Sequence, residues 1–116
     1  MKSEALEATE AECSEGRTAP RVSLDDIKSE ILFECYCTGA QAATSAGAAE
    51  CPDSLGVLTL CIITMRNGFT IVGKSAPASA ENFDSELGRK LAYEDAVRQI
   101  WPLMGFALRQ KLHEGN

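Results

Sequence analysis

A chain of 116 residues is long enough for one domain with a modest core and too short for two. Its hydrophobic share of 45% and charged share of 24% are ordinary for a soluble globular protein. The formal net charge of -6 argues against a general nucleic-acid binder, and no apolar run approaches the roughly 20 residues that a membrane span needs. We therefore expect a cytosolic protein that binds neither duplex nucleic acid nor a membrane. Five cysteines at irregular spacing suit reduced thiols.

The first 21 residues differ in composition from the rest of the chain. Residues 1–20 contain five glutamates against Lys2 and Arg17, which gives this segment a charge of -3. They hold one leucine after the initial methionine and cannot bury enough surface to offset the entropy lost on ordering. The sequence predicts an acidic flexible tail over 1–21, with a transient helix as the alternative, followed by a single α+β domain over 22–116.

A helix start is encoded at Val22–Ile27. Ser23 can cap the free backbone N–H groups, and Asp26 stands three residues later in a capping-box arrangement. We expect a short helix that ends near Phe33. The alternation over 33–38 then predicts a strand, and a helix continuing through residue 35 is the competing interpretation.

Two cysteines in that strand, Cys35 and Cys37, raise the question of a metal site. Zinc sites usually separate paired cysteines by two or more residues and need four ligands, but the sequence contains no second pair. We expect free thiols and no bound metal. The following segment, 39–54, has no periodicity and predicts a flexible loop, either a variable connector or a ligand lid.

A hairpin is expected next in the chain. The apolar β-branched run 57–65 predicts a strand covered on both sides, and Asn67-Gly68 predicts a two-residue type I′ turn. That turn would place Ile63 opposite Val72 and end the second strand near residue 76. Arg66 beside Phe69 suits either a structural cation–π pair or a site that stacks a flat ring.

The C-terminal third predicts helix. Asn82 is expected to be the N-cap, and Pro102 is expected to kink or break the helix, which gives a packed pair over about 83–99 and 103–112. The expected buried face consists of large apolar residues: Phe83, Leu87, Leu91, Tyr93, Val97, Ile100, Trp101, Met104, Leu108 and Leu112. The fold class is therefore α+β: a small antiparallel sheet with a central hairpin, a short N-terminal helix and a kinked C-terminal helical pair.

Catalytic patterns are absent from the sequence. No serine or cysteine has a plausible base, and neither a Walker loop nor a dinucleotide-binding glycine pattern occurs. Arg89-Lys90 near a helix start suits either a phosphate contact or an internal ion pair with Glu86 or Glu94. We expect a protein that is not an enzyme and uses no cofactor.

Several motifs together resemble a known family. They are Leu24-Asp25-Asp26-Ile27, Glu34-Cys35-Tyr36-Cys37-Thr38, Arg66-Asn67-Gly68-Phe69-Thr70, Asn82-Phe83-Asp84, Glu86-Leu87-Gly88-Arg89-Lys90, Ile100-Trp101-Pro102-Leu103 and Gly105-Phe106. The chain is similar over roughly 22–112 to a family of small podovirus-type phage proteins of long-unknown function. That family looks related to the first Thoeris anti-defence family of phages.

The resemblance implies a function. Thoeris anti-defence proteins bind and sequester a cyclic ADP-ribose isomer without cleaving it, and some bind a cyclic oligonucleotide, in pockets at the interface of a homodimer or higher homo-oligomer. The resemblance also implies that the protein is located in the host bacterial cytoplasm. The ligand-binding residues that it implies are Phe69 for stacking, Asn82 for amide hydrogen bonding, and Arg89 and Arg98 for phosphate contact. The alternative is a phage protein that inhibits a host enzyme by protein–protein contact through its acidic tail.

Overall fold

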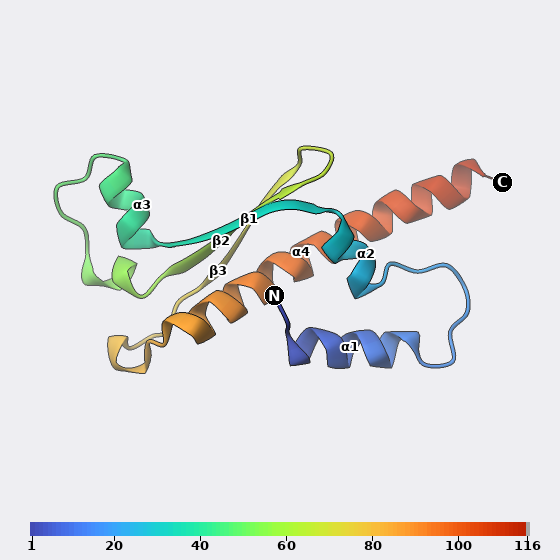
Figure 1. Cartoon of the computed structure of the whole chain (residues 1–116), viewed down its shortest axis with the longest axis horizontal. Helices are drawn as coiled ribbons and strands as arrows, with labels where there is room; N and C mark the ends of the chain where they lie inside the picture. Colours follow the sequence, from blue (N-terminus) through green and yellow to red (C-terminus); the bar gives the residue numbers. More distant parts are fainter. Residues whose placement is uncertain (116) are drawn as a thin grey trace.

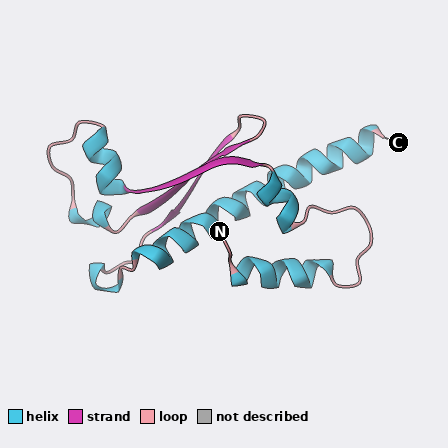
Figure 2. Cartoon of the chain, in the orientation of Figure 1, coloured by secondary structure: helices cyan, strands magenta, loops and turns pink. Residues whose placement is uncertain are grey.

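The computed structural model describes residues 1–115 as an α+β protein (Figure 1). Its elements in chain order are α1 (Glu4–Ser14), α2 (Leu24–Ser29), β1 (Ile31–Thr38), α3 (Gly39–Ser45), the 3₁₀ turn η1 (Asp53–Gly56), β2 (Thr59–Met65), β3 (Thr70–Ser75), the 3₁₀ turn η2 (Ala80–Asn82) and α4 (Ser85–Glu114). The strands form one antiparallel sheet in the order β1-β2-β3, and α4 runs across it (Figure 2). The predicted fold class is confirmed.

The start of α2 forms as the sequence predicts. Ser23 Oγ accepts a hydrogen bond from Asp26 N at 3.0 Å, and Asp26 Oδ2 accepts one from Ser23 N at 2.8 Å. The helix ends at Ser29, earlier than expected, and β1 begins at Ile31. The strand interpretation of residues 33–38 is therefore confirmed over the helical one.

The hairpin between β2 and β3 has a different turn from the predicted one. Met65 N donates to Phe69 O at 2.8 Å and Gly68 N donates to Met65 O at 2.9 Å, so three residues form the loop. Of Asn67 and Gly68, only Gly68 has a positive φ, of 90°, which suits a type I turn followed by a bulge. Ile63 consequently pairs with Ile71, not with Val72.

Burial explains this register. Ile63 is 0% and Ile71 5% exposed, whereas Val72 is 50% exposed. A shift by one residue would turn Val72 toward the core and Ile71 toward solvent. The apolar pattern of β3 therefore selects the three-residue loop.

Helix α4 is continuous, so the predicted pair of helices is wrong. It is capped by Asp84, whose side chain accepts from Glu86 N and Leu87 N, while Asn82 lies in η2. Pro102 removes one backbone donor, but Ile100 before it is buried and Trp101 Nε1 donates to Val22 O at 3.0 Å. These contacts hold α4 in place up to the proline, and the helix continues to Glu114.

The buried face of α4 agrees with the expected one only in part, since Tyr93, Val97 and Ile100 are buried as expected. Gly88, Ala92 and Ala96 face the sheet, whereas Leu87 and Leu91 are 49% and 42% exposed. At Gly73 on β3, a Cβ atom would lie 2.1 Å from the backbone oxygen of Ala92. Small residues on both elements therefore let the backbones of α4 and β3 come into contact.

Polar side chains of α4 form hydrogen bonds with backbone groups at the outer edge of β3. Asp95 Oδ2 accepts from Lys74 N at 2.9 Å, and Gln99 Nε2 donates to Val72 O at 2.8 Å. Unpaired strand edges invite association with other chains, so these bonds protect β3 from such pairing.

The acidic N-terminal segment contains helix α1, in the stretch for which the sequence predicts a flexible tail or, as the alternative, a transient helix. Ser3 caps α1 and donates a hydrogen bond to the buried carboxylate of Glu94, and Leu6 is 2% exposed. One buried leucine and the long-range bond from Ser3 to Glu94 place the start of the helix against the core, and composition does not reveal such contacts.

The segment 39–54, for which the sequence predicts a flexible loop, contains helix α3 and the beginning of η1. Thr38 and Gln41 form a capping box at the start of α3, and η1 follows at Asp53. A Thr followed three residues later by Gln is a helix signal that the alanine-rich composition obscured.

The chain is elongated. Its radius of gyration is 16.8 Å, compared with about 13 Å for a compact domain of similar length, and its extents are 56 × 28 × 18 Å. The C-terminal part of α4 extends past the hairpin (Figure 1). Within residues 1–115, no helix is long and apolar enough to cross a membrane.

Candidate functional site

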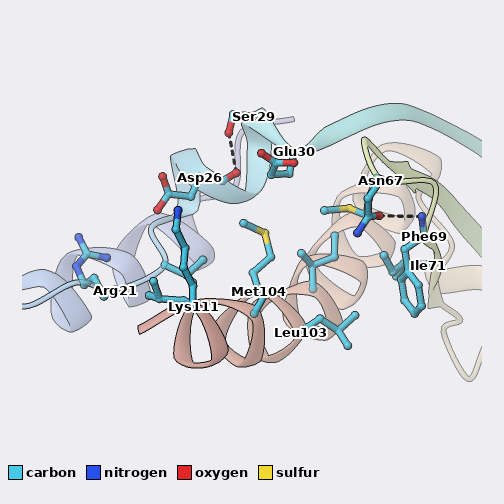
Figure 3. Close-up of a pocket in the computed structure, with 15 residues that line it drawn as sticks. Arg21, Asp26, Ser29, Glu30, Asn67, Phe69, Ile71, Leu103, Met104 and Lys111 are labelled. Carbon is cyan, nitrogen blue, oxygen red and sulfur yellow. Dashed lines mark hydrogen bonds between the residues drawn. The ribbon is translucent and has the colours of Figure 1, made fainter. Parts of the chain in front are cut away.

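A groove of about 570 Å³ lies between α2, the tip of the β2–β3 hairpin and the C-terminal half of α4 (Figure 3). Its volume is in the range of small-molecule sites, roughly 300–1,000 Å³. It is lined by Arg21, Val22, Asp26, Ser29, Glu30, Met65, Asn67, Phe69, Ile71, Ile100, Leu103, Met104, Ala107, Leu108 and Lys111.

The floor of the groove is apolar. Met65, Ile71 and Ile100 belong to the buried core, and Met104 packs against it from α4. A flexible thioether side chain can adapt to ligands of different shape. The floor therefore favours a ligand with a flat or apolar part.

One end of the groove carries an aromatic ring and an amide. Phe69 is 55% exposed although it is a large apolar side chain. Asn67 Oδ1 accepts from Phe69 N at 3.0 Å, which fixes the loop and leaves the Asn67 NH₂ group available as a donor. The hairpin tip is also attached to α2, because Arg66 Nε donates to Ser29 O at 2.7 Å and Arg66 N donates to Glu30 O at 2.8 Å. The aromatic end is therefore held in a fixed position.

Charged side chains occupy the other end. Lys111 extends from α4 across the groove toward Asp26 of α2, and Arg21 stands beside them (Figure 3). The carboxylate of Asp26 is held by the backbone N–H of Ser23, which lowers the pKa of Asp26. Asp26 therefore remains ionised at neutral pH, and the end presents two cations with one fixed anion.

Arg21 is also bonded to the N-terminal helix. Its NH1 and NH2 atoms donate to the two carboxylate oxygens of Glu10 at 3.0 and 3.1 Å. Glu10 Oε2 accepts a further hydrogen bond from Leu24 N at 3.2 Å. The Arg21 bonds are the main cause that lowers the pKa of Glu10 below its ordinary value of 4.5.

Of the four residues predicted from the resemblance, one lies in this groove. Phe69 lines it, whereas Asn82 lines a smaller hollow of about 120 Å³ beside the start of α4. Arg89 and Arg98 are exposed on α4 and lie nine residues apart, which is about 13 Å along a helix and half a turn around it. A single chain therefore does not gather the four side chains, and their role as a set stays a prediction.

Sequence reasoning assigned no binding role to the polar residues of the groove, among them Arg21, Asn67 and Lys111. Lys111 follows Met104 by seven residues, a spacing that places both on one helix face. That signal was present in the sequence. Arg21 comes close to Lys111 only through the docking of α2 on α4, which no local pattern predicts.

A second polar cluster joins β1, β2 and α4 and is partly buried. Tyr36 Oη donates to Glu34 Oε2 at 2.6 Å, and burial raises the pKa values of Tyr93 to about 12 and of Cys61 to about 11. Groups that stay protonated at neutral pH are poor nucleophiles. The arrangement is structural, and all five cysteines are free thiols. Within residues 1–115, no group of three or more His, Cys, Asp or Glu is placed to hold a metal ion.

Comparison with known proteins gives one match. The sequence profile of the phage protein (N4 Gp49/phage Sf6 gene 66) family matches residues 22–112, which include the groove residues from Val22 to Lys111. Neither the curated proteins nor the solved structures contain a significant match to the chain. Because the profile covers well over half of its length, the chain belongs to the phage protein (N4 Gp49/phage Sf6 gene 66) family.

Proposed function

We propose that this phage-family protein binds and sequesters a cyclic ADP-ribose-type immune signal without cleaving it, and thereby blocks Thoeris immunity. The observation that carries the proposal is the groove, which has an aromatic ring and an amide at one end and, at the other, the cations Arg21 and Lys111 beside the carboxylate of Asp26. Such a ligand combines a flat adenine ring with a doubly charged pyrophosphate, so it needs both ends.

Each part of the ligand has a chemical counterpart in the groove. The exposed ring of Phe69 offers a stacking surface for the adenine, and Asn67 offers a donor to its ring nitrogens. Lys111 and Arg21 supply positive charge for the pyrophosphate. The carboxylates of Asp26 and Glu30 can accept hydrogen bonds from ribose hydroxyls.

The experiment that tests the proposal is calorimetric titration of the full chain with the cyclic ADP-ribose isomers and with cyclic di- and trinucleotides. Complexes are then heated and the released ligand is analysed by HPLC. We expect tight binding of at least one isomer and its recovery in unchanged form. Binding followed by recovery of a hydrolysed product would show an enzyme, and no binding of any of these ligands would refute the nucleotide proposal.

A second candidate is inhibition of a host enzyme through the acidic helix α1. The observation that favours it is the exposure of Glu4, Glu7 and Glu12 on this helix. Deleting residues 1–20 would also remove the buried Leu6 and the Ser3 bond to Glu94, so charge-neutral replacement is the better test. The triple variant E4Q/E7Q/E12Q should abolish an inhibitory protein contact and leave nucleotide sequestration unchanged.

A further inference from the structure

The N-terminal helix is bonded to the charged end of the groove. Glu10 is the partner of Arg21 in the only ion pair among residues 1–115, and each of its two carboxylate oxygens accepts a hydrogen bond from the guanidinium. The groove cation Arg21 is therefore already bound to an anion of the chain itself.

We propose that Glu10 competes with the anionic ligand for Arg21, so that α1 regulates the affinity of the groove. The natural identity of that ligand rests on the proposed function, whereas the competition itself concerns any phosphate-bearing ligand. Glu10 holds the NH1 and NH2 atoms of Arg21, so a phosphate that binds end-on through these two atoms needs the N–H groups that Glu10 now occupies. Binding of the ligand in this way requires Glu10 to leave.

The geometry makes this exchange feasible. The side chains of Arg21 and Glu10 are 30% and 23% exposed, so water reaches the pair and screens it. The other anchors of α1, the buried Leu6 and the Ser3 bond to Glu94, lie near the start of the helix. The end of α1 that carries Glu10 can thus separate from Arg21 while the start remains docked.

The rest of the groove does not depend on this helix. α1 lies outside the family-matched residues 22–112, and its only contribution to the charged end is Glu10. When Glu10 leaves, Leu24 N also loses its acceptor. Release of Glu10 therefore has a local signal that can be measured in the unmodified protein.

The test compares E10Q with E12Q in the full chain. Both substitutions remove one negative charge from α1, but Glu12 is exposed and its side chain is not bonded to Arg21. With inorganic pyrophosphate as the probe, we expect E10Q to bind about two- to fivefold more tightly than E12Q, because a screened ion pair contributes an effect of that size. Equal affinities of the two variants, or no pyrophosphate binding by either, would overturn the proposal.

A measurement on the unsubstituted protein covers the case in which E10Q folds poorly. Hydrogen exchange at the Leu24 amide should become faster when pyrophosphate is added, because its acceptor Glu10 has moved away. Unchanged or slower exchange at saturating pyrophosphate would contradict the competition. Cyclic ADP-ribose isomers form a separate arm: if they do not bind while pyrophosphate behaves as expected, the proposed function fails and the competition stands.

Discussion

At the scale of single residues, the groove joins side chains that are far apart in the sequence. Phe69 extends from the hairpin tip and Lys111 from the last turns of α4, and both line the same cavity. Neither residue belongs to the buried core. Truncating either one should therefore change binding much more than stability.

Phe69→Ala and Lys111→Ala should each weaken ligand binding. A stacked base contributes about 1–3 kcal/mol, and a hydrogen bond to a charged group about 1.5–3 kcal/mol, so we expect dissociation constants to rise by roughly tenfold or more. The measurement is calorimetric titration with the isomer that binds the unsubstituted protein. Arg98→Ala is the matched control on α4, since Arg98 is exposed outside the groove. A loss of affinity in that variant alone would favour the predicted α4 arginines over the groove.

Gly73→Ala should destabilise the fold. The added Cβ would lie 2.1 Å from Ala92 O, so α4 would have to move away from β3. Overpacking of this kind costs about 1–3 kcal/mol or more in the free energy of unfolding, measured by denaturant titration. Gly105→Ala is the control with the opposite sign, because its Cβ has nothing within 4 Å and alanine favours a helix. Equal stability of the two variants would argue against close contact between α4 and β3.

At the scale of elements, the sequence predicts the features that depend on neighbouring residues and misses those that depend on contacts between distant segments. The cap formed by Ser23 and Asp26 and the apolar run of β2 depend on neighbouring residues, so the sequence predicts them. Part of the buried face of α4 was missed because close approach, and not hydrophobicity, selects its small residues: Gly88 lies against Thr59 of β2, and Ala92 lies against Gly73 of β3. Of the predicted ligand-binding residues, only Phe69 lines the groove. The charged end of the groove depends on how α2 docks on α4, which the sequence does not reveal.

The continuity of α4 through Pro102 leads to a prediction for that element. Proline lacks the backbone donor that a helix interior uses, at a penalty of about 3 kcal/mol relative to alanine. Pro102 is exposed, so replacement by alanine removes no core contact. Pro102→Ala should raise the melting temperature, measured by circular dichroism. A lower melting temperature would indicate that a bend at residue 102 is needed for packing.

At the scale of the whole molecule, the docking of α1 should depend on pH. Arg21 lowers the pKa of Glu10 below 4.5, so the stability that this carboxylate adds is fully present above pH 4.5 and is lost as pH falls through the lowered value. The difference in unfolding free energy between the unsubstituted protein and E10Q should therefore be larger at pH 7 than at pH 3. Denaturant titrations at both values check this. A constant difference would show that the ion pair does not couple α1 to the fold.

The elongated shape bears on the predicted homo-oligomer. In the C-terminal part of α4, Phe106 is 73% exposed and does not line the groove, and the radius of gyration of 16.8 Å exceeds the value for a compact domain. Exposed apolar residues on a protruding helix favour association with another chain. We propose that a second copy covers this part of α4.

Phe106→Ser should then lower the molar mass measured by light scattering. Phe33→Ser on β1 is the control and should leave the molar mass unchanged, because Phe33 is also exposed, at 55%. If the unsubstituted protein is a monomer at high concentration, Phe106 has another role and the groove must bind its ligand within one chain.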